Sequence, residues 1–343
     1  MAEHFTPTRG ISSDELTLHG QRPESRPREA APGAPGAYEA FVIAYERIRA
    51  LARVIRAPAA IVAAVTPQRR LLDAVLVEDA SSLIIGRHGR CGLRLTGREV
   101  ALRQSALLVL AEGDTTTTRV WDLNTGTPFF TEEGQPSAAL SADGPCYFTV
   151  HGHGIWVIPA DLAATWPART DDAWAALPRR VLIDRRPAEA SARDRQPAAH
   201  PTSRPPPEAR EAEKEISHVT LSGAPLVLGE PEDVEVGWGT LRIEHGARRR
   251  QHHVSAERLE RGVLVGRYER CGLAIDPTER DISRVHALLV KIGADLWAMD
   301  TASSNGLWRG RFAVVADVLA DFDAIMLGKA ARLCWERYQH PEA

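Results

Sequence analysis

A ten-residue segment occurs twice in this chain, and the repeat limits the possible folds more than any other feature of the sequence. GRHGRCGLRL begins at Gly86 and GRYERCGLAI begins at Gly266; six of the ten positions are identical, and a seventh exchanges Leu for Ile. The two glycines are 180 residues apart, and Asp122 and Asp300, which end similar apolar runs, are 178 residues apart. This nearly constant offset predicts two tandem copies of one fold, each of about 125 residues.

Two stretches of biased composition divide the 343-residue chain. Residues 1–36 are rich in Pro, Gly, Arg and Glu, and residues 185–215 end in the run RPPPEAREAEKE. Such segments bury too little apolar surface to offset the entropy that a chain loses on folding. We therefore expect a disordered segment at 1–36, a first domain at 37–160, a linker at 161–215 and a second domain at 216–343.

Short apolar runs joined by turn residues predict β-strands in both halves. HALLVKIGADLWAMD has two such runs around Gly293, and SALLVLAEGDTTTTRVWDL has two around Gly113, each typical of a β-hairpin. Strands at this spacing favour an all-β fold, with two tandem β-sandwiches joined by the Pro-rich linker. The segment FVIAYERIRALARVI, which begins at Phe41, fits either a strand or an amphipathic helix.

Three polar motifs follow one another in the second half. They are Gly266-Arg267, Ser283-Arg284-Val285-His286 and Ser303-Ser304-Asn305-Gly306, and strand-like segments separate them. Loops at one end of a sandwich converge although they are distant in sequence. Guanidinium groups match phosphate oxygens two at a time, and hydroxyl groups donate to the oxygens that remain. The motifs therefore predict a site for an oxyanion.

The order and spacing of these motifs resemble the forkhead-associated (FHA) domain, a module that binds phosphothreonine peptides. The resemblance covers roughly residues 238–338, and it is specific because GR, SxxH and SNG occur together, with WAMD before the last motif. It implies an FHA/SMAD-like β-sandwich for the second half and a degenerate copy of this sandwich for the first half.

The resemblance also implies which residues bind the phosphopeptide. Arg267 and Ser283 correspond to the main phosphate ligands of the family, and Arg284 adds a further phosphate contact. Ser304 supplies the hydroxyl group before Asn-Gly, and Asn305 corresponds to the asparagine that hydrogen-bonds the main chain of the peptide.

Three further residues are expected to support the site without touching the ligand. Gly266 and Gly306 permit the tight turns next to Arg267 and Asn305, and His286 holds its loop in place. We also expect Cys91 and Cys271 to fill equivalent buried positions below the repeated turn.

The first half keeps the turn but lacks most of the binding groups. Alignment of the two halves through their shared ALLV places Leu102 opposite Ser283 and Ser105 opposite His286, and residues 126–128, Gly-Thr-Pro, fall opposite the Ser-Asn-Gly motif. The basic residues that remain are Arg87 and Arg103. We therefore expect phosphopeptide binding by the second domain only.

These features together predict a phosphothreonine-dependent adaptor in Ser/Thr kinase signalling. The expected partner is a phosphothreonine-containing protein, either a Ser/Thr kinase or its substrate. The alternative is a structural scaffold protein whose contacts with other proteins do not depend on phosphate. Thr202 in the linker and Thr6 and Thr8 near the N-terminus are candidates for phosphorylation that would occupy the protein's own site.

Other classes of function find little support in the sequence. The formal net charge of −3 gives no general attraction to nucleic acid or to an anionic membrane. Ser283 and His286 lack the GxSxG elbow and the acidic partner of a hydrolase, so we expect no catalytic residues. His151 and His153 are too few for a zinc site, and we expect no metal and no cofactor. Four dispersed cysteines and the lack of an N-terminal apolar leader fit a cytoplasmic protein.

Overall fold

The computed structural model describes residues 33–55, 58–113, 115–123, 125–186, 216–222, 226, 237–329 and 331–338. Most of the N-terminal segment expected to be disordered lies outside these residues, as does the stretch from 187 to 215. Thr6, Thr8 and Thr202 therefore also lie outside the described part of the chain.

The first unit is a sandwich of two sheets. Sheet I has six strands in the order β2-β1-β11-β10-β7-β8, and sheet II has seven in the order β12-β13-β9-β6-β5-β3-β4. The strands of sheet I are β1 (Ala59–Val65), β2 (Leu71–Glu78), β7 (Phe129–Thr131), β8 (Pro136–Ser137), β10 (Cys146–Val150) and β11 (His153–Pro159). Those of sheet II are β3 (Ser81–Gly86), β4 (Leu93–Arg94), β5 (Ser105–Glu112), β6 (Thr115–Asp122), β9 (Ala139–Ala142), β12 (Arg179–Asp184) and β13 (Ile216–Leu221).

The second unit is also a sandwich of two sheets. Sheet III has five strands in the order β17-β16-β18-β19-β22, and sheet IV has six in the order β15-β14-β24-β23-β20-β21. Sheet III contains β16 (Val263–Gly266), β17 (Leu273–Ala274), β18 (Ala287–Ile292), β19 (Asp295–Asp300) and β22 (Ala316–Leu319). Sheet IV contains β14 (Gly239–His245), β15 (Arg248–Val254), β20 (Leu307–Arg309), β21 (Phe312–Val314), β23 (Ala324–Leu327) and β24 (Ala331–Arg337).

The two units share one strand order. Every strand of sheets III and IV has a counterpart in the same place of sheets II and I, and only β12 and β13 are additions to the first unit. The two predicted hairpins are β5-β6 and β18-β19, and their turn glycines, Gly113 and Gly293, have positive φ. The prediction of an all-β chain with two tandem sandwiches is therefore confirmed.

Helices cover the outer face of sheet I. The segment that fitted either a strand or a helix forms α1 (Ala37–Ala52), because Phe41, Tyr45 and Ile48 recur at helical spacing on its buried face. The shorter helices α2 (Ala160–Ala164) and α3 (Thr170–Ala176) contribute to the same apolar layer. No helix within the described ranges has both the length and the apolar character needed to span a membrane.

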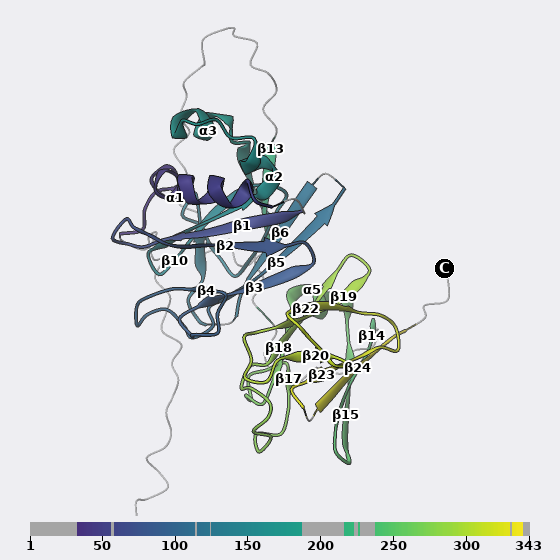
Figure 1. Ribbon diagram of the computed structural model, residues 1–343. Coiled ribbons are helices and arrows are strands. Elements are labelled where there is room, and N and C mark those ends of the chain that lie inside the picture. The colour runs from purple at the N-terminus through teal and green to yellow at the C-terminus, as the bar shows by residue number, and fades with distance from the viewer. Residues whose placement is uncertain are drawn as a thin grey trace, which may run out of the picture.

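The two units pack through the outer faces of sheets II and III (Figure 1). Leu107 and Val109 of β5 point into the first sandwich, whereas Leu108 and Leu110 point toward the second unit. The described elements therefore form five layers in the order α1, sheet I, sheet II, sheet III and sheet IV. The run ALLVL in β5 is continuously apolar because both faces of sheet II are covered.

The strand pairings differ from the expected domain boundaries at two places. The first part of the expected linker, residues 161–186, contains α3 and β12, which pack on or pair with the first unit. The strand β13 at residues 216–221, expected in the second domain, pairs with β9 and β12 of sheet II. Its residues Val219 and Leu221 are buried in the core of the first sandwich. The composition of the linker does not reveal that β13 packs there.

Candidate functional site

The three polar motifs of the second unit meet at one end of its sandwich. Arg267 follows β16, Ser283 precedes β18, and Ser304 lies between β19 and β20. The main-chain N–H of Arg267 donates to the carbonyl oxygen of Ser283 at 3.2 Å, and the N–H of Ser304 donates to Ser283 Oγ at 2.8 Å. Ser283 therefore connects all three motifs, and only 7% of it is exposed.

His286 joins two of these loops from below. Its Nδ1 accepts the main-chain N–H of Ser283 at 3.0 Å, and its Nε2 lies 3.0 Å from the carbonyl oxygen of Gly306. Since Nδ1 is an acceptor, the neutral ring carries its proton on Nε2 and donates it to Gly306. The ring is completely buried, and burial is the main cause that lowers the pKa of His286.

Two glycines allow the loops to approach so closely. A Cβ atom on Gly266 would lie 2.3 Å from the carbonyl oxygen of Arg284, which is closer than any real contact of that kind. Gly306 has a φ of +74°, in the left-handed region that favours glycine. The Oγ of Ser303 accepts the N–H of Gly306 at 2.8 Å and so holds this turn.

The groups that face solvent are basic and polar. Arg284 and Ser304 are exposed, and Arg267 and Asn305 are half-buried. The side-chain amide of Asn305 donates to the carbonyl oxygen of Asp281 at 2.8 Å, which fixes the side chain and leaves its oxygen available as an acceptor. The arrangement can hold an oxyanion between guanidinium groups and hydroxyl groups.

The first unit preserves the geometry of the loops but not their chemistry, and its register differs by one residue from the sequence alignment. Ile85 pairs with Ser105 in the first unit, as Val265 pairs with Ala287 in the second. The residue opposite Ser283 is therefore Ala101, and not Leu102 as expected. The ungapped alignment through ALLV is wrong by one position, because the pairing with β3 and β16 makes Ser105, and not Ala106, the equivalent of Ala287.

Gln104 takes the place of His286 in the first unit, where Ser105 was expected. Its Oε1 accepts the N–H of Ala101 at 3.1 Å, and its Nε2 donates to the carbonyl oxygen of Thr127 at 3.3 Å. These bonds are counterparts of those from His286 to Ser283 and Gly306. The first unit thus keeps the connection between its loops, whereas the hydroxyl group of Ser283 is replaced by the methyl group of Ala101.

The repeated cysteines occupy equivalent positions. Cys91 Sγ lies 3.3 Å from the carbonyl oxygen of Leu102, and Cys271 Sγ lies 3.3 Å from that of Arg284. Both side chains are buried, and burial raises the pKa of the Cys271 thiol to about 12. They are small packing residues at the contact between the units and not reactive thiols.

Two residues near the site were not identified from the sequence. Arg90 and Arg103 belong to the first unit, yet both donate to main-chain carbonyl groups of residues 302–304 in the second. The sequence showed Arg103 only as a retained basic residue, since no local pattern tells which surface of another unit a side chain will meet.

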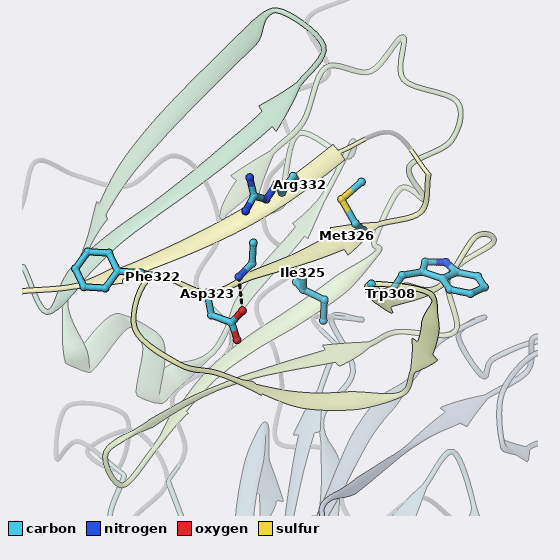
Figure 2. Close-up of a pocket in the computed structure, with 8 residues that line it drawn as sticks. Trp308, Phe322, Asp323, Ile325, Met326 and Arg332 are labelled. Atoms are coloured by element: carbon cyan, nitrogen blue, oxygen red, sulfur yellow. Dashed lines mark hydrogen bonds between the residues drawn. The ribbon is translucent and has the colours of Figure 1, made fainter.

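A separate pocket of about 230 Å³ lies on the outer face of sheet IV. Figure 2 shows Trp308 at one end of it, Phe322 at the other, and Met326 and Arg332 between them. The indole N–H of Trp308 donates to the carbonyl oxygen of Asn305 at 2.6 Å, which links this face to the loop of the site. Arg332 is the one basic residue in the lining, so the pocket has fewer cationic groups for an oxyanion than the loops have.

The hydrogen bonds of Ser283 and His286 also bear on whether these two residues could act as a nucleophile and its base. The hydroxyl oxygen of Ser283 accepts from Ser304, and His286 Nδ1 is occupied by the main chain of Ser283, so His286 is not placed to remove the hydroxyl proton. In the described part of the chain, no group of three His, Cys, Asp or Glu side chains could hold a metal ion.

Comparison with known proteins finds a family match within the second unit. Residues 263–328 match the family model of the FHA domain. These residues contain all three motifs and the strands β16 to β23. No curated protein sequence matches the chain.

Several solved structures are similar over part of the chain. The FHA-1 domain of Mycobacterium tuberculosis Rv1747 is 23% identical, with 29% of this chain and 98% of that chain covered and a TM-score of 0.24. The Slr1951 protein of Synechocystis is 25% identical, with 30% and 97% covered and a TM-score of 0.26. Mycobacterium tuberculosis EmbR, in complex with a low-affinity phosphopeptide, is 21% identical, with 30% and 26% covered and a TM-score of 0.25. At these scores, the similarity to the FHA family rests on the match of residues 263–328.

Proposed function

We propose that this chain, which contains an FHA domain in its second unit and an FHA-like copy in its first, is a phosphothreonine-dependent adaptor protein. The observation that carries the proposal is the convergence of Arg267 and Ser304 on Ser283, whose carbonyl oxygen accepts the main-chain N–H of Arg267 and whose hydroxyl oxygen accepts that of Ser304. It brings cationic and hydrogen-bonding groups to one place, within the residues that match the FHA family.

In this proposal the phosphate binds between the loops. Arg267 and Ser283 are its main ligands, Arg284 adds a second guanidinium group, and Ser304 donates its hydroxyl group. Asn305 binds the main chain of the peptide, because its amide is fixed by Asp281 and its oxygen faces away from that bond. A phosphothreonine carries a charge of about −1.5 to −2 at neutral pH, so charge-assisted hydrogen bonds dominate its affinity.

The first unit does not bind phosphothreonine in this proposal. Ala101 replaces Ser283, and in the neighbouring loop the hydroxyl group of Thr125 donates to Asp122 Oδ1 at 2.7 Å. Arg87 remains, and its Nε donates to the carbonyl oxygen of Val100 at 3.0 Å, as Arg267 Nη1 donates to that of Pro277 at 3.4 Å, so the missing hydroxyl group and not the arginine distinguishes the two units. The partner is a phosphothreonine-containing protein in Ser/Thr kinase signalling, either the kinase or its substrate.

Binding of a degenerate peptide library to the full chain tests the proposal. One library has phosphothreonine at its fixed central position, and matched libraries have phosphoserine or unmodified threonine there. We expect the phosphothreonine library to bind with micromolar affinity and the unmodified library to bind at least about tenfold more weakly.

Equal affinity for the phosphorylated and unmodified libraries would contradict the proposal and favour a scaffold with phosphate-independent contacts. Treatment of a cell lysate with phosphatase before capture on the full chain separates the same two cases for natural partners. An adaptor that depends on phosphate loses its partners, and a scaffold keeps them.

A further inference from the structure

The first unit reaches the second at the loop between β19 and β20. Arg103 Nη2 donates to the carbonyl oxygen of Ala302 at 2.7 Å. Arg90 Nη1 donates to the carbonyl oxygen of Ser303 at 2.9 Å and also to that of Ser304. Three successive carbonyl groups of one loop therefore accept hydrogen bonds from guanidinium groups of the other unit.

The packing of the two units holds these arginines in place. The repeated turn that carries Arg90 also carries Cys91, which is buried in the apolar cluster between sheets II and III together with Cys271 and Ala302. Arg103 is half-buried beside this cluster. The contact is therefore part of a packed interface and not an isolated pair of exposed side chains.

Positive charge gathers at this edge of the site. Burial is the largest cause that lowers the pKa of Arg103; Asp300 opposes the change, whereas Arg284 and Arg90 contribute to it. The Nε of Arg103 is buried and has no hydrogen-bond partner within the described residues. Asp300 is itself engaged, since both of its carboxylate oxygens accept the N–H of Ser303.

The exposed guanidinium group of Arg90 has donors to spare. Its Nη1 serves the two carbonyl groups, and its Nε and Nη2 make no hydrogen bond to the residues that the structure describes. A guanidinium group in this position, beside the exposed Ser304, suits a carboxylate or a phosphate group.

We infer that the first unit completes the peptide-binding site of the second, an inference that rests on the proposed function. Arg90 and Arg103 hold the main chain of residues 302–304 in position and place a second cationic centre beside Ser304. The full chain therefore prefers peptides that carry a second anionic group, either a carboxylate or a second phosphate, next to the phosphothreonine. A single sandwich of this type would lack that centre.

Fluorescence anisotropy with the full chain tests this preference. The probe is a labelled phosphothreonine peptide of otherwise uncharged sequence, and variants of it carry Asp or a second phosphothreonine at each neighbouring position in turn. We expect the best doubly anionic peptide to bind about tenfold more tightly than the parent. The Asp and phosphothreonine series show which anion the site favours.

Variants of the arginines assign the preference to the first unit. Arg90→Gln and Arg103→Gln remove the charge with little loss of volume, and we expect each to reduce the preference to about threefold or less. Arg90→Lys keeps the charge and should retain most of the preference. Arg47→Gln, on the exposed face of α1 at the far side of sheet I, is the matched control and should behave as the wild type.

Hydrogen–deuterium exchange without peptide gives a second readout. Residues 302–306 should exchange faster in Arg90→Gln and Arg103→Gln than in the wild type or in Arg47→Gln. The inference would be overturned if Arg90→Gln and Arg103→Gln both kept the wild-type preference for doubly anionic peptides and both exchanged residues 302–306 at the wild-type rate. Wild-type protein that binds no phosphothreonine peptide would overturn the proposed function and the peptide preference, whereas the exchange result would still report the contact between the units.

Discussion

His286 and Gln104 perform the same structural task with different side chains. Each accepts an N–H from the start of its own loop and donates to a carbonyl oxygen in a neighbouring loop. The histidine motif could be recognised from the sequence, because it has a family pattern. Gln104 could not, because it lies in no pattern and the alignment placed Ser105 there; only the strand register shows the equivalence.

A substitution of His286 tests this equivalence. His286→Ala removes both hydrogen bonds, leaves the buried N–H of Ser283 without a partner and opens a cavity, so we expect the free energy of unfolding to fall by about 2–4 kcal/mol. His286→Gln, which copies the first unit, should lose less than about 1.5 kcal/mol. Chemical denaturation of both variants measures the difference, and equal losses would show that Gln cannot bridge the loops of the second unit.

The buried state of His286 also predicts a dependence on pH. Burial lowers the pKa of its folded state below the ordinary value of about 6.5, so the unfolded chain takes up the proton first as the pH falls. Its contribution to stability is thus present above about pH 6.5 and is lost as the pH falls through the lower, folded pKa. Asp300 opposes the lowering and Arg103 adds to it.

Chemical denaturation at neutral and at mildly acidic pH measures the contribution of neutral His286 to the free energy of unfolding. The wild type should lose more stability between the two conditions than His286→Gln, which has no group that titrates there. Identical pH profiles would mean that His286 is protonated equally easily in the folded and unfolded states.

Gly266 in the second repeated turn and Gly89 in the first differ in the space around them. A Cβ atom on Gly266 would meet the main chain of Arg284, whereas one on Gly89 would meet no atom within 4 Å. We expect Gly266→Ala to displace the Ser283 loop, to lower the melting temperature and to weaken peptide binding. Gly89→Ala should leave both unchanged, and a Gly266→Ala protein with wild-type affinity would contradict the close approach.

At the scale of elements, the apolar periodicity predicted the two hairpins correctly. It failed where the same apolar run was used both to predict a strand and to align the two halves of the chain. The apolar runs of β5 and β18 predicted strands correctly, yet the same runs misled the alignment, because the shared ALLV contains no polar residue that would mark the register. The segment at 41–55 fitted two structures, and packing against sheet I selects the helix. Strand β13 joins sheet II because its buried face fits that core.

Phe41 tests the place of α1 in the first unit. It is completely buried and lies 5.0–6.0 Å, between ring centroids, from Tyr45, Trp156, Trp166 and Trp174. Phe41→Ala should therefore lower the free energy of unfolding by about 3–5 kcal/mol. Val42→Ala, at a position of the same helix that is 42% exposed, should cost less than about 1 kcal/mol. Similar effects in a denaturation series would show that α1 does not pack as described.

At the scale of the whole molecule, the sequence indicated a duplication but not how its copies meet. The outer faces of sheets II and III are apolar at equivalent positions, among them Ile84 and Leu264, Leu108 and Val290, and the two cysteines. Each copy thus uses the same surface for the contact, which places Arg90 and Arg103 at the loop of the second copy. Tertiary packing of this kind depends on the shapes of two folded surfaces, and no local pattern encodes it.

The central claim, that phosphothreonine binds the second unit through its loops and not the first, can be tested with two equivalent arginines. Isothermal titration calorimetry of the full chain with a phosphothreonine peptide compares the wild type with Arg267→Ala and Arg87→Ala. We predict that Arg267→Ala weakens binding by roughly ten- to a hundredfold, since a charge-assisted hydrogen bond contributes about 1.5–3 kcal/mol, while Arg87→Ala has no effect. Equal affinity of the wild type and Arg267→Ala, or an equal loss in both variants, would contradict the account.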